Sequence, residues 1–536
     1  MNHKEQNPES VPGLSRALWL LTLAGTLCGC TGGPRTGIEA ALDRVRPEDV
    51  RRDLFFLAAD SMMGRDTPSP QLDSAASYIA RQFRHDGLLP VNGSYLQPVA
   101  LNIIDLGKVN TFRVRLGSVD RTFEIKSEFM PFEMTADRQV GAPVVFAGYG
   151  ITAPEYRYDD YGGIDARGKI VLVFRHEPGE DDPTSVFLGK TPTEYSRLST
   201  KVRIAIDHGA VGMIVVTDPL NHSSLAPRGF PWPSLSRTIP RDALPLQLAE
   251  DERARIPVVH AGEQVIVQLF GSTDSLRALE AGIDQRLQPH SFDIAGSEAF
   301  IRTSIEIRVY SANNVVGLMP GSDPARLDET VIVGAHYDHV GYKKEHAAGE
   351  RYIYNGADDN ASGTCALLRV AAALGGLPSA PRRSILCIAF AGEEKGLFGS
   401  EYYVRHPLLP LSGTVAMLNM DMVGRNAPDT LFLIGTEGSP ELARIARQED
   451  ARVGFALVDQ KLTSGGSDHL SFMKRNIPEL FFHSGLEDVY HTVNDRPELI
   501  DVPKVARVAR LVFLTAWHIA SDSSHYHYNP TTLPMF

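Results

Sequence analysis

The sequence has few cysteines and no concentration of positive charge. Only four cysteines occur among 536 residues, too few for a disulfide scaffold in a chain of this length. Acidic residues outnumber basic ones, 65 against 53, and the formal net charge is −12. We therefore expect no nucleic-acid partner. No His-Glu-x-x-His pair occurs, which excludes the zinc proteases that carry both histidines on one helix.

Long apolar runs are also lacking, apart from one near the start that is too short to span a bilayer. This run lies behind a positive residue and ends in Leu-Cys-Gly-Cys30, which predicts a signal peptide over residues 1–29. The ending resembles a bacterial lipobox, so we expect export and a lipid on Cys30, with plain secretion as the alternative. Thr31 indicates an outer-membrane lipoprotein that faces the periplasm or the cell surface. Cys30 is then the only contact with a membrane.

The length exceeds what one hydrophobic core usually holds and predicts two or three domains. The contents of apolar and charged residues, 43% and 22%, are those of an ordinary folded protein. Changes in composition, the first clear one near Gly141, predict five parts after the signal peptide. These are a linker (30–37), an N-terminal part that packs on the main domain (38–134), a second compact domain (135–270), the main domain (271–524) and a tail (525–536).

The main domain repeats a pattern of strand, loop and helix. Its strands are short continuous apolar runs, which are typical of a mainly parallel sheet covered on both faces. These runs lie at residues 314–319, 331–335, 384–390 and 415–420. The sequence therefore predicts an α/β domain, closed by a last helix over residues 502–521.

Polar side chains follow these strands. Because open α/β sheets place ligand sites beyond the carboxyl ends of their strands, we expect the side chains to meet at one edge. Imidazoles and carboxylates are ligands that zinc accepts at about 2 Å. The residues concerned are His336, Asp359 in the stretch Gly-Ala-Asp-Asp, Glu393, Glu394, Asp421 and His491.

Each of these residues has an ordinary alternative. Asp358 and Asp359 could cap the helix that follows them, and Glu393 and Glu394 could begin a solvated helix. The two histidines could be plain loop residues. Their joint occurrence, each behind a strand, favours a metal centre. Arg425 has two interpretations as well: it could hold a substrate carboxylate, but an internal ion pair is favoured.

The order His-x-Asp, Gly-Ala-Asp-Asp, Glu-Glu, Asp, Tyr-His resembles the di-zinc aminopeptidase family, metallopeptidase family 28, over residues 313–521. A strand, helix and strand around the Gly-Ala-Val-Gly turn at 209–212 resemble a protease-associated domain. The resemblance implies a zinc-exopeptidase fold, which is a mainly parallel mixed sheet flanked by helices. It also implies a smaller inserted domain rich in β-structure.

The resemblance further implies which residues hold two zinc ions. Asp359 would bridge both ions. His336 and Asp421 would complete the site of one ion, while Glu394 and His491 would complete the site of the other.

Other residues receive catalytic roles from the same resemblance. Glu393 would be the general base, and Asp338 would accept a hydrogen bond from His336 and so fix its tautomer. Tyr490 would stabilise the tetrahedral oxyanion. His339, next to Asp338, is interpreted as a structural neighbour.

Cys365 and Cys387 fall on core faces and are expected to be buried thiols rather than a bridge.

These roles imply an aminopeptidase that acts on peptides with a free N-terminus. Two zinc ions bring more positive charge than three ligand carboxylates neutralise, and the excess lowers the pKa of bound water toward ~7. Glu393 can then take the proton of that water as it attacks the scissile carbonyl. The alternatives are a carboxypeptidase, which needs a basic pocket, a glutaminyl cyclase, and a receptor-like scaffold without catalysis.

Overall fold

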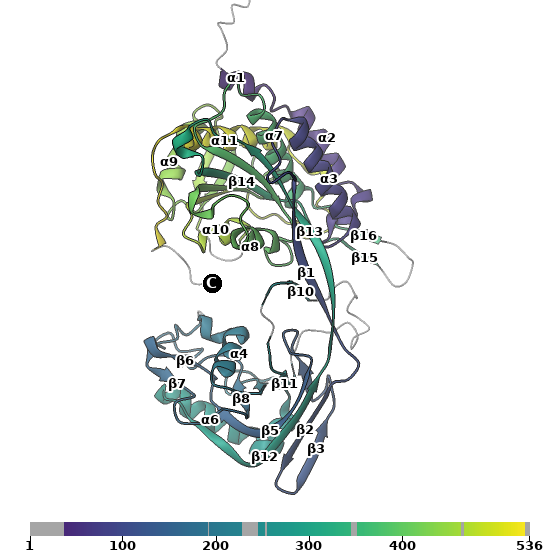
Figure 1. The fold of residues 1–536 in the computed structure, drawn as a ribbon, viewed down its shortest axis with the longest axis vertical. Helices are drawn as coiled ribbons and strands as arrows, with labels where there is room; N and C mark the ends of the chain where they lie inside the picture. The colour runs from purple at the N-terminus through teal and green to yellow at the C-terminus, as the bar shows by residue number, and fades with distance from the viewer. Residues whose placement is uncertain are drawn as a thin grey trace, which may run out of the picture.

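The protein folds into two lobes joined by long strands (Figure 1). The predicted signal peptide and Cys30 lie outside the residues that the structure describes. No helix in the described part of the chain is long and apolar enough to cross a membrane. The computed structural model describes residues 37–190, 192–227, 245–251, 254–344, 351–461 and 466–530.

The first lobe is built on a nine-stranded mixed sheet. Its four central strands, β17, β14, β18 and β21, are parallel neighbours, and antiparallel strands flank them on both sides. In spatial order the strands are β10 (Leu246–Leu248), β1 (Leu96–Leu106), β13 (Ile305–Met319), β17 (Ser384–Phe390), β14 (Thr330–His336), β18 (Thr414–Met420), β21 (Glu479–His483), β19 (Thr430–Ile434) and β20 (Ala456–Asp459).

The central strands are buried on both faces, as their continuous apolar sequences predict. All seven residues of β14 and of β17 are buried. Val331 and Val333 pack into the core on one face, whereas Ile332 packs into a separate cluster on the other. The predicted α/β class is thus confirmed, with the parallel strands at the centre of a mixed sheet.

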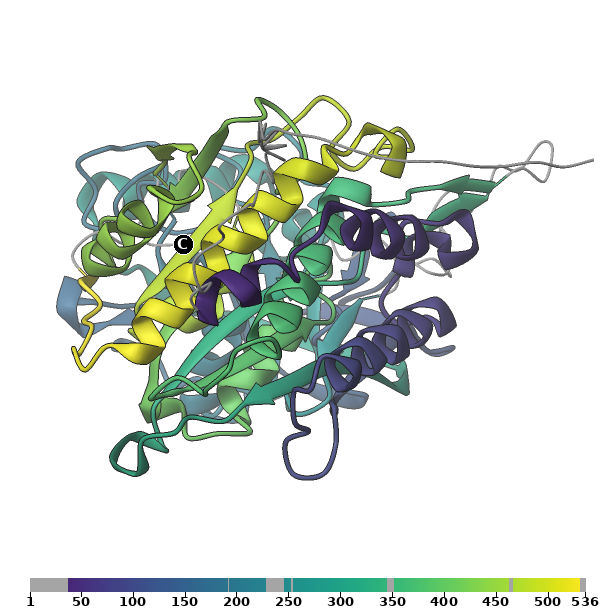
Figure 2. The same cartoon turned by 90° about the horizontal axis from the view of Figure 1, so that it is seen from above.

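Helices cover both faces of this sheet. Helix α11, in yellow in Figure 2, crosses one face beside α7 and the purple N-terminal helices, and it spans the predicted residues 502–521. Residues of α8 and α10 pack in the cluster on the opposite face. The helices of this lobe are α1 (Gly37–Leu42), α2 (Pro47–Leu57), α3 (Pro70–His85), α7 (Gly363–Leu374), α8 (Phe398–Arg405), α9 (Pro440–Asp450), α10 (His469–Met473) and α11 (Val502–Ser521).

The second lobe contains an eight-stranded sheet. This sheet is larger than the predicted range 135–270, because β12 pairs antiparallel with both β2 and β5 and so brings earlier and later segments into it. In spatial order its strands are β3 (Val119–Phe123), β2 (Thr111–Leu116), β12 (Ser291–Thr303), β5 (Arg138–Ala147), β8 (Ile170–Phe174), β9 (Gly212–Val216), β11 (Val258–Ala261) and β4 (Phe129–Pro131).

The second lobe is an insertion between β1 and β13 of the first sheet, and β10, which lies within the inserted segment, returns to pair with β1. Strand β1 leaves the first sheet before β2 begins, and β13 returns to it directly after β12. Residues of three helices, α4 (Leu198–Asp207), α5 (Glu263–Phe270) and α6 (Thr273–Arg286), pack in the core of the lobe. Short two-stranded pairs complete the fold: β6 (Thr152–Ala153) with β7 (Tyr158–Asp159), and β15 (Tyr342–Lys344) with β16 (Arg351–Ile353).

Cys365 on α7 and Cys387 on β17 are both free and buried. Burial raises the pKa of each thiol above its ordinary value. The expectation of two buried thiols is confirmed.

Arg65 fastens the N-terminal segment to the loops at the end of the central strands. Its fully buried guanidinium donates hydrogen bonds to four backbone carbonyl oxygens, so all the acceptors are main-chain atoms. These carbonyls belong to Leu57, Tyr337, Asn355 and Gly356. The guanidinium thereby joins residues that are far apart in the sequence.

Replacing Arg65 by Met should therefore destabilise the first lobe. The substitution leaves several buried carbonyls without a donor, at a cost of about 3 kcal/mol or more. Thermal unfolding followed by circular dichroism should show a lower midpoint. The control Arg84→Met removes an exposed arginine that stacks on Tyr95 and should change the midpoint little. Equal midpoints for the two variants would contradict the role given to Arg65.

Candidate metal centre

The predicted ligands meet at the carboxyl ends of the four central strands. They follow different strands that are parallel neighbours, so the sheet itself brings them together. His336 is the last residue of β14, Glu393 and Glu394 follow β17, Asp421 follows β18, His491 lies in the loop after β21, and Asp359 lies in the π-type turn Ala357–Ser362 that precedes α7.

One group of ligand atoms surrounds His336. Its Nε2 lies 3.4 Å from Asp359 Oδ1 and 3.3 Å from Asp421 Oδ1. All three side chains are nearly inaccessible to solvent. A tetrahedral zinc ion with ligands at about 2.0–2.1 Å has neighbouring ligand atoms roughly 3.3 Å apart. This group therefore fits a zinc ion with three protein ligands.

A second group surrounds His491. Its Nε2 lies 3.0 Å from Asp359 Oδ2 and 3.0 Å from Glu394 Oε2. His491 adopts a positive φ of 53°, which is uncommon for a residue other than glycine. Burial lowers the pKa of its imidazole, but Asp359 and Glu394 outweigh that effect and raise it to about 10. A metal ion that binds here must therefore displace a proton.

Asp359 serves both groups with different atoms. Its Oδ1 faces His336, and its Oδ2 faces His491. Burial raises the pKa of this carboxyl, yet the two imidazoles hold it well below its usual range. The carboxylate is thus ionised and placed between two sets of donors.

Several ligand atoms are buried without a hydrogen-bond partner. Within the described part of the chain these atoms include Nε2 of His336, Nε2 of His491 and Oδ1 of Asp421. Buried polar atoms are normally paired, so orphaned atoms at one point indicate a missing partner. A cation among them would be that partner.

Asp495 holds the turn that carries Asp359. Its two carboxylate oxygens accept the backbone N–H groups of Asp358 and Asp359 at 2.8 and 3.1 Å. Asp358 itself points away from the ligands, and its Oδ1 accepts the N–H of Gly424. Nothing in the local sequence singled out Asp495, because its partners are main-chain atoms of a distant segment.

Asp338 connects the end of β14 with the loop after β17. Its carboxylate accepts hydrogen bonds from Thr67 Oγ1 at 3.0 Å and from the Glu393 N–H at 3.1 Å. His336 Nδ1 lies 3.3 Å from the Asp338 carbonyl oxygen and 3.6 Å from its carboxylate. The main-chain oxygen of Asp338 is thus the nearer acceptor for His336, and the carboxylate positions the backbone of Glu393.

Glu393 is set beside the ligands without belonging to either group. Its Oε2 lies 3.8 Å from His336 Nε2. Burial raises the pKa of Glu393 well above its ordinary value, and the nearby carboxyls of Asp421 and Asp468 add to this against the effect of His336. A carboxyl with a raised pKa at this point is suited to accept and return a proton.

Tyr490 and His339 both contact His491. The ring of Tyr490 stacks on the imidazole with centroids 3.8 Å apart, and the side chain is 41% exposed. His339 is fully buried and packs edge-on against His491. Its Nδ1 lies 2.7 Å from Glu394 Oε1, which leaves Oε2 of Glu394 directed to His491. This role of His339 was not predicted from the sequence; its position beside Asp338 was the available signal.

Arg425 forms an ion pair with Glu487, which confirms the favoured interpretation of this residue. Burial raises the pKa of Glu487 to about 7, and Arg425 opposes the shift. The guanidinium is therefore engaged by a side chain of the protein.

Comparisons with known proteins agree with this geometry. Residues 314–516 match the model of peptidase family M28, and residues 140–266 match that of the PA domain. Over 213 residues the chain is 31% identical to the aminopeptidase YwaD of Bacillus subtilis (strain 168), covering 38% of this chain and 43% of YwaD. It is 29% identical over 209 residues to a probable leucine aminopeptidase of Trichophyton verrucosum (strain HKI 0517), covering 37% of this chain and 56% of that protein. The matches thus span about half the length of these relatives.

A solved structure shares the whole architecture. The aminopeptidase from Aneurinibacillus sp. strain AM-1 aligns with 93% of this chain and 98% of its own, with a TM-score of 0.51 and 21% identity. Identity at this level shows a common fold. The two family matches, together with the ligand groups at the strand ends, show that residues 314–516 form a domain of peptidase family M28 and that residues 140–266 form a PA domain.

Proposed function

We propose that the chain is an aminopeptidase with two zinc ions that removes residues from the free N-terminus of peptides. The observation that carries the proposal is the placement of Asp359, whose two oxygens face separate ligand groups. A single ion would need only one of these groups. The matched relatives, whose names describe aminopeptidases, support the reaction.

The donor set favours zinc over magnesium or calcium. Each group contains an imidazole nitrogen, which zinc accepts readily and hard oxygen-seeking ions do not. Bound at Asp359, two zinc ions would supply a water molecule of lowered pKa and positive charge for an oxyanion. The residues of this chain then have to bind the substrate and move one proton.

Glu393 is the proposed proton carrier. Its carboxylate lies beside the first ligand group, close enough to take a proton from a nucleophilic water and pass it to the departing amine. Asp338 fixes its backbone through the N–H of Glu393. Tyr490 is half-exposed and stacks on His491, and its hydroxyl can donate a hydrogen bond to the oxyanion of the tetrahedral intermediate.

The carboxypeptidase alternative needs a free cation for the terminal carboxylate of the substrate. Arg425, the residue considered for this role, is paired with Glu487. This pairing favours the aminopeptidase. Export and a lipid on Cys30 stay predictions from the sequence.

A panel of aminoacyl p-nitroanilides and short peptides tests the function. We expect release of the first residue from free peptides and no release from the same peptides with an N-terminal acetyl group. The physical reason is that a free amine beside the metal centre fixes the first peptide bond at the nucleophile. Release of C-terminal residues from acetylated peptides would identify a carboxypeptidase. Cyclisation of N-terminal glutamine with loss of ammonia would identify a glutaminyl cyclase, and either result would refute the proposal.

The variant Glu393→Gln tests the base. It keeps the shape of the side chain but cannot accept a proton, so kcat should fall by about 10²–10⁴-fold while the metal content stays that of the wild type. Metal content is measured by inductively coupled plasma mass spectrometry. Glu498→Gln, at an exposed residue, is the matched control and should retain normal turnover. Near-normal kcat in the Glu393 variant would exclude it as the base.

The variant His339→Ala tests how Glu394 is held. Loss of the Nδ1 donor frees Glu394 to rotate, and zinc affinity at the second group should fall by about 10–100-fold. His339→Asn places an amide nitrogen near the same position and should recover most of the affinity. Competition with a chromophoric chelator measures both. Wild-type affinity in the alanine variant would show that His339 only packs there.

A further inference from the structure

A second group of metal-binding side chains lies in the second lobe. We call it the second-lobe cluster, and its members offer two imidazoles and two carboxylates within 4.8 Å of one another. They are His176, Glu180, Asp218 and His222.

The cluster sits at the carboxyl ends of two parallel strands. Strands β8 and β9 are paired in register, with Phe174 opposite Val216. His176 and Asp218 each follow two residues later, so they leave the sheet side by side. The remaining two ligands follow four residues further along each loop. The arrangement is the one that α/β sheets use for ligand sites.

The backbone around His176 is held in place. Its N–H donates to Asp218 Oδ1, and its carbonyl accepts a hydrogen bond from the buried Nζ of Lys201 at 2.6 Å. Oδ1 of Asp218 also lies 2.8 Å from His176 Nδ1, so both oxygens of this carboxylate face the imidazole.

The distances between ligand atoms fit one tetrahedral ion. His176 Nδ1 lies 2.9 Å from Asp218 Oδ2 and 3.7 Å from Glu180 Oε2. His222 Nε2 lies 3.3 Å from Asp218 Oδ2 and 3.0 Å from Glu180 Oε2. These values bracket the spacing of roughly 3.3 Å between ligands of a tetrahedral zinc ion.

The ring arrangement is compatible with two neutral imidazoles that bind one ion. His176 and His222 stack with ring centroids 4.2 Å apart. Two imidazolium rings at this distance would repel each other, whereas two neutral rings that bind one ion would not. A divalent ion would also balance the two carboxylates.

A buried carboxylate next to the cluster supplies independent support. Glu280 on α6 is fully buried; its Oε2 accepts the N–H of Leu220, between Asp218 and His222. Its Oε1 has no hydrogen-bond partner among the described residues. Burial, together with nearby Asp218, raises the pKa of Glu280 to about 8. The buried Oε1 of Glu280 is thus a polar atom beside the cluster that lacks a partner in the described part of the chain, which is the observation expected next to a ligand site.

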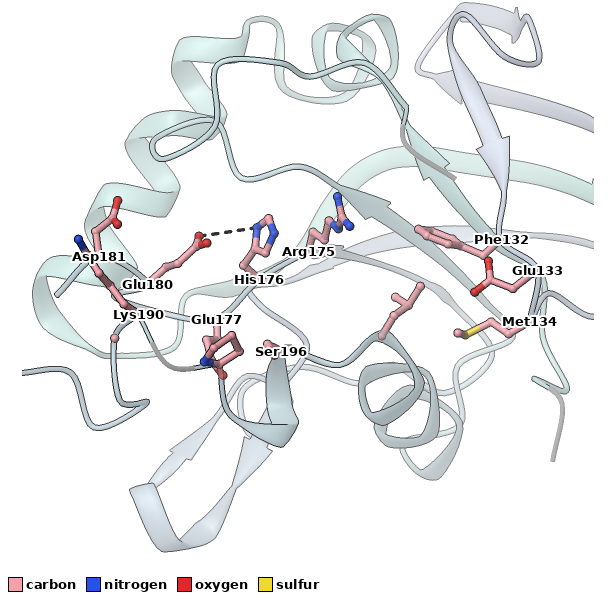
Figure 3. A pocket seen from close by; sticks show the side chains of 13 residues that line it. Phe132, Glu133, Met134, Arg175, His176, Glu177, Glu180, Asp181, Lys190 and Ser196 are labelled. Atoms are coloured by element: carbon pink, nitrogen blue, oxygen red, sulfur yellow. Dashed lines mark ion pairs between the residues drawn. The ribbon is translucent and has the colours of Figure 1, made fainter. Parts of the chain in front are cut away.

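We propose that the second-lobe cluster binds one borderline first-row divalent ion, zinc in first place. The ligand set of two nitrogens and two oxygens selects such ions over calcium or magnesium. A cavity of about 570 Å³ borders the cluster at His176 and Glu180, shown in Figure 3 with the two side chains facing each other, and gives the ion an entry path. The bound ion would clamp the loops after β8 and β9 together.

Metal content of the full chain tests the proposal. After gel filtration in metal-free buffer, the double variant His176→Ala/His222→Ala should contain about one equivalent less metal than the wild type. A second double variant, His208→Ala/His290→Ala, removes two histidines of the same lobe outside the cluster and should match the wild type. Equal metal content in the wild type and the cluster variant would overturn the proposal and leave an ion-pair network only.

Two further measurements separate metal bound at the second-lobe cluster from metal bound in the first lobe, and from any loss of metal caused by misfolding of a variant. In the background His336→Ala/His491→Ala, which removes the candidate centre of the first lobe, about one equivalent should remain and should disappear with the cluster substitutions. Anomalous diffraction at the zinc edge from wild-type crystals needs no variant. A peak among the four ligands supports the site. Its absence from crystals grown with zinc refutes the proposal even if the variants fail to fold.

Discussion

The burial of several carboxylates at one edge of a sheet is the constraint on which the first lobe depends. Asp359, Glu393, Glu394 and Asp421 are all largely removed from water. Each buried charge costs several kcal/mol unless a positive partner lies close to it. No ion pair joins any of them to a lysine or arginine in the described ranges; their partners are imidazoles. The fold therefore leaves buried negative charge that bound metal ions are suited to neutralise.

The register of the central strands brings these carboxylates to one place. His336 on β14 is opposite Phe390 at the end of β17, and Gly334 is opposite Asn419 near the end of β18. A shift of two residues in either pairing would move a ligand by about 7 Å, further than any side chain here could compensate. Burial on both faces resists such a shift, because every residue of β14 and β17 is packed. The packing of the apolar core thus fixes the strand register, and the register sets the spacing of the ligands.

The ligands and the strands that carry them could be predicted from the sequence because both are local patterns. A short apolar run followed by a histidine or a carboxylate is readable within ten residues or so, as at His336 and Asp421. The residues that hold the backbone of the site in place could not be predicted from the sequence. Arg65 and Asp495 bind backbone atoms of distant segments, and backbone atoms leave no trace in a residue pattern. The sheet of the second lobe also takes in β2 and β12 from outside the predicted range 135–270, and their pairing joins segments that are far apart in the sequence.

The two lobes place polar clusters by the same rule but with different coordination. In the first lobe, His336, Asp359 and Asp421 form a group of three protein ligands, and a tetrahedral ion bound by them would leave a position open for water. The neighbouring group has four candidate ligands, which are His339, Asp359, Glu394 and His491. The second-lobe cluster offers four ligands, which can close a tetrahedral site. An open position next to a carboxyl such as Glu393 suits a reaction, whereas a closed set suits an ion that holds loops in place. Parallel strand ends thus gather the donors in both lobes, and in the first lobe the three-ligand group beside Glu393 is the one that leaves room for a reaction.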